Sequence, residues 1–513
     1  MPYRLLNLLL VIILAINAPA QTGQFRPQLH FSPTEHWMND PNGMYYNNGV
    51  YHLFFQYYPG GTKWGPMHWG HATSKNLLNW KEEPIALYPD SLGYIFSGSA
   101  VVDKNNTSGF GKNGKTPIVA IFTHHDPVGE KEKRKDYQVQ SLAYSLDDGM
   151  TWTKYAGNPV LKNPGIVDFR DPKVNWNKKI SKWVMTLATK DRISFYSSPN
   201  LKDWTKLSEF GETLGAHGGV WECPDLFPLT HKGKEYWVLL VSINPGGPNG
   251  GSATQYFIGD FDGKNFIPAD TTTRFMDYGT DNYAGVTINN TGDRVILIGW
   301  MSNWLYAESV PTVKWRSAMT LPRELGLKEV NGKPWLVSVP AKEVARLDKN
   351  DQPRGEEKAL TKKNEALKWT MDKGDSGKPG WTLSEGDSLM RLHFDLPVND
   401  FNVTLSNTKS KTVVGFDKES NRFYIDRTEG GIDNFYPGFA KRHWAPRIST
   451  NDRISVNLIV DVMSVEFFAD GGLTVMTDIF FPVPAYTLAT LSSAGLQQIQ
   501  NLGTYRLIPT AAK

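Results

Sequence analysis

From about residue 30 to residue 325, the chain consists of short apolar runs rich in Val, Ile, Phe, Tyr and Trp, separated by Gly, Asn, Asp and Pro. β-branched and aromatic residues favour strands, and the residues between the runs favour tight turns. The pattern therefore predicts an all-β domain made of many short strands.

Four segments of this region resemble one another. Each follows a strand-like run, contains turn-forming residues and ends in an aromatic residue, and they are residues 74–80, 145–152, 198–204 and 260–266. A hairpin repeated in every blade of a β-propeller has this form. The final aromatic residues lie about 72, 52 and 62 positions apart, which predicts four to six blades with insertions. Unrelated hairpins of a β-sandwich are the alternative interpretation.

The pattern of residue types changes after residue 340, where a charged stretch indicates a surface linker with helical turns. Beyond it, apolar and polar residues alternate over short segments, a pattern typical of a second and smaller β domain, a sandwich. These segments are residues 412–416, 423–426, 454–460 and 464–469. We expect a propeller domain over residues 21–340, a linker over 341–365 and a sandwich over 366–513.

The first twenty residues have the form of a signal peptide. Arg4 precedes an apolar run that ends at Ile16, and residues 18–20 (Ala-Pro-Ala) form a small-residue cleavage site. The run is short for a membrane span, and no later segment approaches the roughly 20 apolar residues that a span needs. We expect an exported protein, periplasmic or extracellular, without a membrane span.

Composition narrows the class of ligand. The chain has 55 Lys and Arg against 52 Asp and Glu, which gives a net charge of +3. This small charge does not indicate a nucleic-acid-binding protein, which is typically strongly basic. Seventeen Trp, 21 Tyr and 25 Phe supply flat apolar faces that suit stacking on a sugar ring. The composition favours a neutral ligand.

Three carboxylates are candidates for catalysis. Asp40 lies beside a predicted Pro-Asn-Gly turn, which could hold its side chain at a strand end facing a cleft. Asp171 lies between Arg170 and a proline, and Glu222 lies between an aromatic residue and another turn. Glycosidic cleavage needs one carboxylate that attacks the anomeric carbon or activates water, and one acid that protonates the leaving group. The alternatives are that each carboxylate caps its own turn or joins a surface ion pair.

The sequence indicates no metal site and no cofactor. The histidine pairs at residues 68 and 71 and at residues 124 and 125 do not follow a recognised zinc spacing, so we expect structural or substrate-lining roles for them. Cys223 is the only cysteine, which excludes an intrachain disulfide. We expect it to be a buried thiol beside the acid.

Taken with these residues, the chain resembles glycoside hydrolase family 32, the β-fructofuranosidases that include invertases, inulinases and levanases. Four blocks carry the resemblance in the family's order: Trp-Met-Asn-Asp-Pro-Asn-Gly at 37–43, Phe-Ser-Gly-Ser at 96–99, Arg-Asp-Pro at 170–172 and Glu-Cys-Pro-Asp at 222–225. The resemblance implies a five-bladed β-propeller followed by a β-sandwich.

The resemblance also implies roles. Asp40 would be the nucleophile, Glu222 the general acid and base, and Asp171 the stabiliser of the transition state that holds ring hydroxyls. Retention of configuration would require the carboxyls of Asp40 and Glu222 to lie about 5–5.5 Å apart. The residues matched to the fructose pocket are Asn39, Gln56, Trp64, Ser97 and Arg170.

Residues 276–284 and 299–304 look most like the exo-acting inulinases and levanases of the family. On this likeness we expect Trp304 to form a second pocket wall, and Asp281 and Tyr283 to lie at the mouth of the site. Arg427 and Glu466 fit sandwich positions, for which we expect structural roles.

The implied function is the release of terminal β-D-fructosyl units from fructans such as levan or inulin, and from sucrose. A fructosyltransferase or an endo-fructanase would share the catalytic trio. A propeller glycosidase acting on arabinan or xylan is less compatible with the intact block at 37–43. A non-catalytic fructan-binding protein would be expected to have lost a carboxylate. The sequence leaves linkage preference and oligomeric state open.

Overall fold

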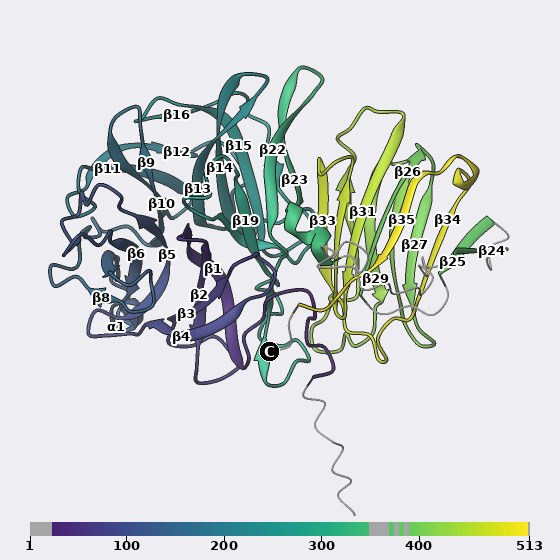
Figure 1. Cartoon of the computed structure of the whole chain (residues 1–513), viewed down its shortest axis with the longest axis horizontal. Helices are drawn as coiled ribbons and strands as arrows, with labels where there is room; N and C mark the ends of the chain where they lie inside the picture. The colour runs from purple at the N-terminus through teal and green to yellow at the C-terminus, as the bar shows by residue number, and fades with distance from the viewer. Residues whose placement is uncertain (1–22, 348–368, 374–378, 384–388, 511–513) are drawn as a thin grey trace, which may run out of the picture.

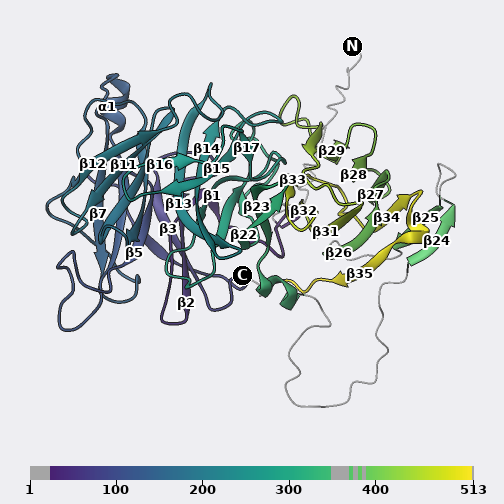
Figure 2. The ribbon, with the colours of Figure 1, turned by 90° about the horizontal axis from the view of Figure 1, so that it is seen from above.

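The computed structural model of the chain consists of two all-β domains that lie side by side (Figures 1 and 2). It describes residues 23–347, 369–373, 379–383 and 389–510. The expected signal peptide over residues 1–20 lies outside these ranges, as does the expected linker from residue 348 onward. Within the described ranges, we find no helix long and apolar enough to cross a membrane.

The N-terminal domain is a five-bladed β-propeller, as predicted. Each blade is an antiparallel sheet, and the first strands β1, β5, β9, β13 and β18 contact one another in a closed ring. Blade 1 contains β1 (His36–Asn47), β2 (Val50–Tyr58), β3 (His68–Ser74) and β4 (Lys81–Leu87). Blade 2 contains β5 (Tyr94–Val102), β6 (Ile118–His125), β7 (Gln138–Ser145) and β8 (Thr153–Lys154). Blade 3 contains β9 (Phe169–Asn177), β10 (Lys182–Thr189), β11 (Arg192–Ser198) and β12 (Thr205–Phe210).

The last two blades carry additional short strands. Blade 4 contains β13 (Val220–His231), β14 (Lys234–Asn244), β15 (Ala253–Phe261) and β16 (Phe266–Pro268), with β17 (Arg274–Phe275) paired to β15. Blade 5 contains β18 (Tyr283–Thr287), β19 (Ile296–Met301), β22 (Arg323–Val330) and β23 (Lys333–Pro340), with β21 (Ala318–Met319) paired to β19. After β19 in the sequence, β20 (Trp315–Arg316) pairs in parallel with β1 of blade 1. This pairing joins the last blade of the ring to the first. A short helix, α1 (Pro127–Lys131), lies between β6 and β7.

The four repeated segments of the sequence are the turns between the third and fourth strands of blades 1 to 4. In three of them the indole N–H of the final tryptophan, Trp80, Trp152 or Trp204, donates a hydrogen bond of 2.8–2.9 Å to the carbonyl three residues earlier. The ring thereby closes the turn and starts the outer strand. In blade 5 the corresponding turn is only residues 331–332, which explains why the sequence shows no fifth copy.

One local prediction was wrong. Asp40 does not lie beside a turn at a strand end, because residues 36–47 form the single strand β1. Its register against β2 is interrupted around Asp40, and the first strands of all other blades are interrupted too, near residues 96–97, 171–172, 223–224 and 284–285. A β-bulge bends the strand, tolerates proline and re-aims the side chain beside it. The Asp-Pro sequences are therefore bulges inside strands.

The C-terminal domain is a β-sandwich, as predicted. Its seven-stranded sheet runs in the order β24 (Trp369–Lys373), β25 (Pro379–Leu383), β34 (Leu488–Ser493), β27 (Phe401–Ser406), β28 (Lys411–Asp417), β29 (Arg422–Glu429) and β30 (Arg442–Pro446). Its five-stranded sheet runs in the order β33 (Thr474–Ile479), β32 (Ser464–Ala469), β31 (Arg453–Asp461), β26 (Met390–Pro397) and β35 (Gln500–Arg506). Apolar side chains of both sheets, such as Val403 and Leu458, form one buried core between them. Two 3₁₀ helices, η1 (Lys342–Leu347) and η2 (Leu496–Gln498), complete the described elements.

The two domains meet through buried ion pairs. The guanidinium of Arg323, from blade 5, lies 2.8 Å from Glu466 of β32 and 2.9 Å from Asp277. Residues 277–281 run along β33, and a Cβ on Gly279 would lie only 2.1 Å from the carbonyl oxygen of Thr477. The close approach fixes the sandwich against the blade that carries Tyr283.

Candidate active site

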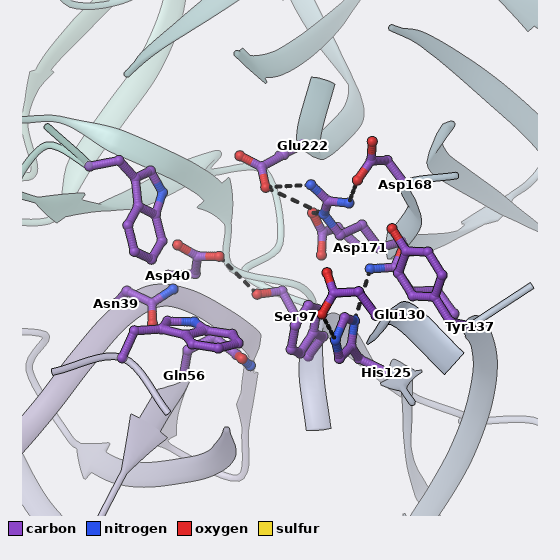
Figure 3. A pocket seen from close by; sticks show the side chains of 15 residues that line it. Asn39, Asp40, Gln56, Ser97, His125, Glu130, Tyr137, Asp168, Asp171 and Glu222 are labelled. Atoms are coloured by element: carbon purple, nitrogen blue, oxygen red, sulfur yellow. Dashed lines mark hydrogen bonds and ion pairs between the residues drawn. The ribbon is translucent and has the colours of Figure 1, made fainter. Parts of the chain in front are cut away.

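A cavity of about 210 Å³ opens at the end of the propeller channel where the first strands begin (Figure 3). Its lining comes from several blades and consists of Asn39, Asp40, Gln56, Trp64, Phe96, Ser97, His125, Glu130, Tyr137, Gln138, Asp168, Arg170, Asp171, Glu222 and Trp304. The three candidate carboxylates therefore face one pocket from β1, β9 and β13. Of the eight side chains expected to bind substrate, all except Asp281 and Tyr283 line it.

Asp40 is held by a hydroxyl and a thiol. The Ser97 hydroxyl donates a 3.0 Å hydrogen bond to Oδ2 of Asp40, and the Cys223 sulfur lies 3.6 Å from the same oxygen. Burial, together with the charge of Glu222, raises the pKa of Asp40 to about 6, although the hydrogen bonds from Asn39 and Ser97 oppose the shift. Asp40 is therefore mainly ionised at pH 7, as a nucleophile requires.

Asp171 is the most enclosed of the three carboxylates, with only 5% of its surface exposed. It adopts a positive φ of 63° at its bulge, an uncommon backbone conformation that turns it into the channel. Its Oδ2 accepts a 3.0 Å hydrogen bond from the backbone N–H of Cys223. Burial raises the pKa of Asp171 to about 7 against the opposing charge of Arg170.

Glu222 is fixed by two donors. Arg170 donates to its Oε1 through Nη2 at 2.9 Å and through Nε at 3.3 Å, and the Tyr283 hydroxyl donates to its Oε2. Arg170 also pairs with Asp168, which holds the guanidinium plane between two carboxylates. Both oxygens of Glu222 thus have a defined position at the pocket wall.

Aromatic side chains line the remaining walls. Trp64, 38% exposed, meets Phe96 edge-on at 6.1 Å, and Phe96 stacks on the His125 ring at 4.2 Å. Trp304, which also lines the cavity, stacks on the buried Trp37 at 5.8 Å. The two tryptophans expected from the sequence as pocket walls do line the cavity.

Two predicted positions are wrong. Tyr283 is only 1% exposed and lies behind Glu222 rather than at the mouth of the site. Asp281 is fully buried at the domain interface, where its Oδ2 lies 2.8 Å from Arg427 of the sandwich and its Oδ1 accepts a 2.7 Å hydrogen bond from Tyr306. Successive side chains of a strand point to opposite faces of the sheet. This alternation does not continue through the turn that precedes β18, so the sequence did not show which side chains face the channel.

Several lining residues were not identified from the sequence as substrate-binding. The Gln138 amide donates a 3.2 Å hydrogen bond to Nδ1 of His125, and Nε2 of His125 donates to the Glu130 carboxylate at 3.1 Å. For His125 the sequence predicted a structural or substrate-lining role. Glu130 and Tyr137 reach the pocket because α1 and the loop after it fold over the end of β6. The placement depends on an insertion in blade 2, and no local motif marks it.

Within the part of the chain that the structure describes, no group of three or more His, Cys, Asp or Glu side chains is arranged to hold a metal ion.

Cys223 is buried, 3.7 Å from Oδ2 of Asp171 and close to Asp40. Burial raises the pKa of this thiol, so it is not a thiolate nucleophile at neutral pH.

Comparison with known proteins identifies the family over most of the chain. The family model described as "Glycosyl hydrolases family 32 N-terminal domain" matches residues 30–340, and "Glycosyl hydrolases family 32 C terminal" matches residues 354–505. The chain is 45% identical to a levanase of Bacillus subtilis over 493 residues, which covers 92% of this chain and 69% of the levanase. It is 41% identical to an extracellular exo-inulinase of Aspergillus niger over 508 residues, which covers 92% of each chain.

The fold agrees with these relatives. The crystal structure of an exo-inulinase from Aspergillus awamori superposes with a TM-score of 0.83 at 37% identity, over 95% of this chain and 99% of that one. A fructofuranosidase from Schwanniomyces occidentalis in complex with fructose superposes with a TM-score of 0.79 at 32% identity, over 95% and 97%. The chain therefore belongs to glycosyl hydrolase family 32 and is a glycosidase.

Proposed function

We propose that the protein is an exported, retaining β-fructofuranosidase that releases terminal β-D-fructosyl units from fructans and from sucrose. The observation that carries the proposal is the meeting of Asp40, Asp171 and Glu222, from three different blades, in one small pocket. The relatives named levanase, exo-inulinase and fructofuranosidase support the fructosyl specificity. The signal-peptide pattern of residues 1–20 and the extracellular exo-inulinase relatives support export.

In this proposal hydrolysis proceeds by two displacements. Asp40 attacks the anomeric carbon while Glu222 gives a proton to the departing oxygen, and a fructosyl ester forms on Asp40. Glu222 then takes a proton from water, which attacks the same carbon and releases fructose with retained configuration. Asp171 accepts hydrogen bonds from ring hydroxyls.

Two buried polar atoms fit a sugar ligand. Oδ1 of Asp40 and Nε2 of Gln56 are buried and have no hydrogen-bond partner among the described residues, although both residues line the cavity. Unpaired buried polar atoms are costly, so a ligand that supplies hydroxyl groups at these points gains affinity. Together with Asn39, Ser97 and Arg170, these residues would form the fructose shell, with Trp64 and Trp304 as its walls.

The size of the cavity favours exo action. At about 210 Å³ it is smaller than the roughly 300–1,000 Å³ of pockets for drug-sized ligands. One terminal sugar ring fits in this volume. An internal residue would fit only if the chain could enter and leave the pocket on both sides of it. We also propose that the propeller over residues 21–340 is the catalytic domain, followed by a linker over residues 341–365 and the sandwich over residues 366–513.

The test is the product profile of residues 21–513 given levan, inulin and sucrose in parallel, with chain lengths resolved over time. Free fructose as the first product from each fructan is expected. Short oligosaccharides at early times would establish an endo mode, products longer than the substrate would establish fructosyl transfer, and the absence of products would refute the proposal. The relative rates on levan and inulin would give the preferred linkage.

A further inference from the structure

A second cavity, of about 440 Å³, lies at the opposite end of the propeller channel. Its lining comes from the last residues of β5 and β9, from the loop after β5, from Trp183 of β10 and from the segment after β18. Asp171 faces the active-site pocket at the start of β9, and Trp176 lies five residues further along the same strand. At roughly 3.3 Å per residue, the two cavities are about 16 Å apart along the strand.

An aromatic ring forms one wall of this second cavity. Trp176 is 37% exposed and meets the buried Trp183 edge-on, with ring centroids 5.1 Å apart and an interplanar angle of 75°. The indole N–H of Trp183 donates a 2.8 Å hydrogen bond to Thr107, which fixes that ring as a support. No residue in the described part of the chain accepts a hydrogen bond from the N–H of Trp176. The ring therefore offers both an apolar face and a donor to a ligand.

The polar groups around the ring include both donors and acceptors. Asn175, Asn289 and Asn290 each donate a hydrogen bond through Nδ2 to a backbone carbonyl, and each also carries an amide oxygen that can accept one. Lys104, Asn105 and Lys178 are exposed at the cavity. Asp103 is the one carboxylate among the lining residues, and its two oxygens are already occupied by the N–H and hydroxyl groups of Thr107 and Ser108 at 2.7–3.0 Å. A ligand here would meet an aromatic face, hydrogen-bond donors and amide acceptors, but no free carboxylate. This combination suits a hydroxyl-rich, uncharged chain.

We propose that this second cavity binds internal residues of a fructan chain. The inference rests on the proposed function, because it takes the occupant from the polymer that the active site would shorten. A pocket that holds one terminal ring leaves the rest of a long chain unbound. A second binding site on the same molecule raises the local concentration of chain ends without any change at the catalytic centre. Sucrose is too short to reach it.

The experiment compares Trp176→Ala with the unmodified protein by affinity electrophoresis in gels containing levan or inulin, and by kinetics on fructan and on sucrose. Removal of the ring is expected to weaken polymer affinity by roughly 3- to 10-fold and to raise KM for the polymer by the same factor. We expect kcat on either substrate, and kcat/KM for sucrose, to stay within two-fold of the unmodified protein. Trp176→Phe, which keeps an aromatic face, should recover most of the polymer affinity.

Ile267→Ala is the matched control, because Ile267 on β16 is 56% exposed in the same domain and does not line the cavity. Equal retardation of Trp176→Ala, Ile267→Ala and the unmodified protein would overturn the inference, as would no retardation of the unmodified protein. A loss of sucrose turnover in Trp176→Ala would also contradict it. Failure of the proposed function would be recognised separately, since the unmodified protein would then release no fructose from any substrate.

Discussion

The corrected position of Asp281 leads to a specific expectation about stability. Its carboxylate is fully buried and accepts hydrogen bonds from Arg427, Tyr306 and the backbone N–H of Ile479 at 2.7–3.0 Å. Asp281→Ala would leave the Arg427 guanidinium, itself 1% exposed, without its partner in the domain interface. Breaking a buried ion pair in this way costs about 3–5 kcal/mol.

For a propeller domain of about 320 residues, with an unfolding entropy of about 2.1 cal/mol/K per residue, that loss corresponds to a decrease in Tm of about 4–8 °C. The assay is differential scanning calorimetry at pH 7, together with kcat/KM for sucrose at 25 °C, which should stay within about two-fold. Asp293→Ala, an exposed residue of the same blade, is the control and should change Tm by less than about 2 °C.

A double variant separates the ion pair from local packing. In Asp281→Ala with Arg427→Met no charge is left unpaired, so part of the lost Tm should return. An unchanged Tm in Asp281→Ala, combined with a higher KM for sucrose, would refute this account and return Asp281 to the mouth of the active site.

Two further predictions concern pH. Because the pKa of Asp40 is raised to about 6 and its ionised form is the nucleophile, kcat/KM should fall as the pH decreases through about 6. Ser97→Ala removes a hydrogen bond that opposes the rise in this pKa, so the acidic side of the pH profile should move to higher pH in that variant. An unchanged pH profile in Ser97→Ala would contradict the role of Asp40 as nucleophile. Although burial opposes its charge, hydrogen bonds to Asp461 and Glu466 raise the pKa of His30 to about 9, above its unfolded value near 6.5. The stability that charged His30 contributes is therefore complete below pH 6.5 and is lost as the pH rises to about 9, so the Tm difference between the unmodified protein and His30→Gln should shrink over that range. A difference that stays constant from pH 6 to pH 9.5 would show that His30 does not change its charge there.

The fold could be predicted because its repeat is local. The turn between the third and fourth strands is a contiguous segment, and a tryptophan such as Trp80 bonds to a carbonyl only three residues away. The fifth blade was invisible to this reasoning because its turn is a bare two-residue connection at 331–332.

The site could be predicted only in part, because its residues become neighbours through bulges and an insertion. The motif blocks identified Asp40, Asp171 and Glu222, but the interruption of strand register at each of them determines that they face one cavity. Glu130 approaches His125 through α1, which no periodicity predicted. Asp281 was misplaced because its partner Arg427 lies 146 residues away in the other domain.

The central claim is that Asp40 forms a covalent fructosyl intermediate and that Glu222 is the acid and base on either side of it. Glu222→Ala should lower turnover of sucrose by roughly 10²–10⁴. With a fructoside whose leaving group needs no protonation, the first displacement should still proceed, and the intermediate should accumulate because no base activates water. Mass spectrometry of that variant after mixing should find one fructosyl group, on the peptide that contains Asp40. Unimpaired turnover of sucrose, or no adduct on that peptide, would contradict the account.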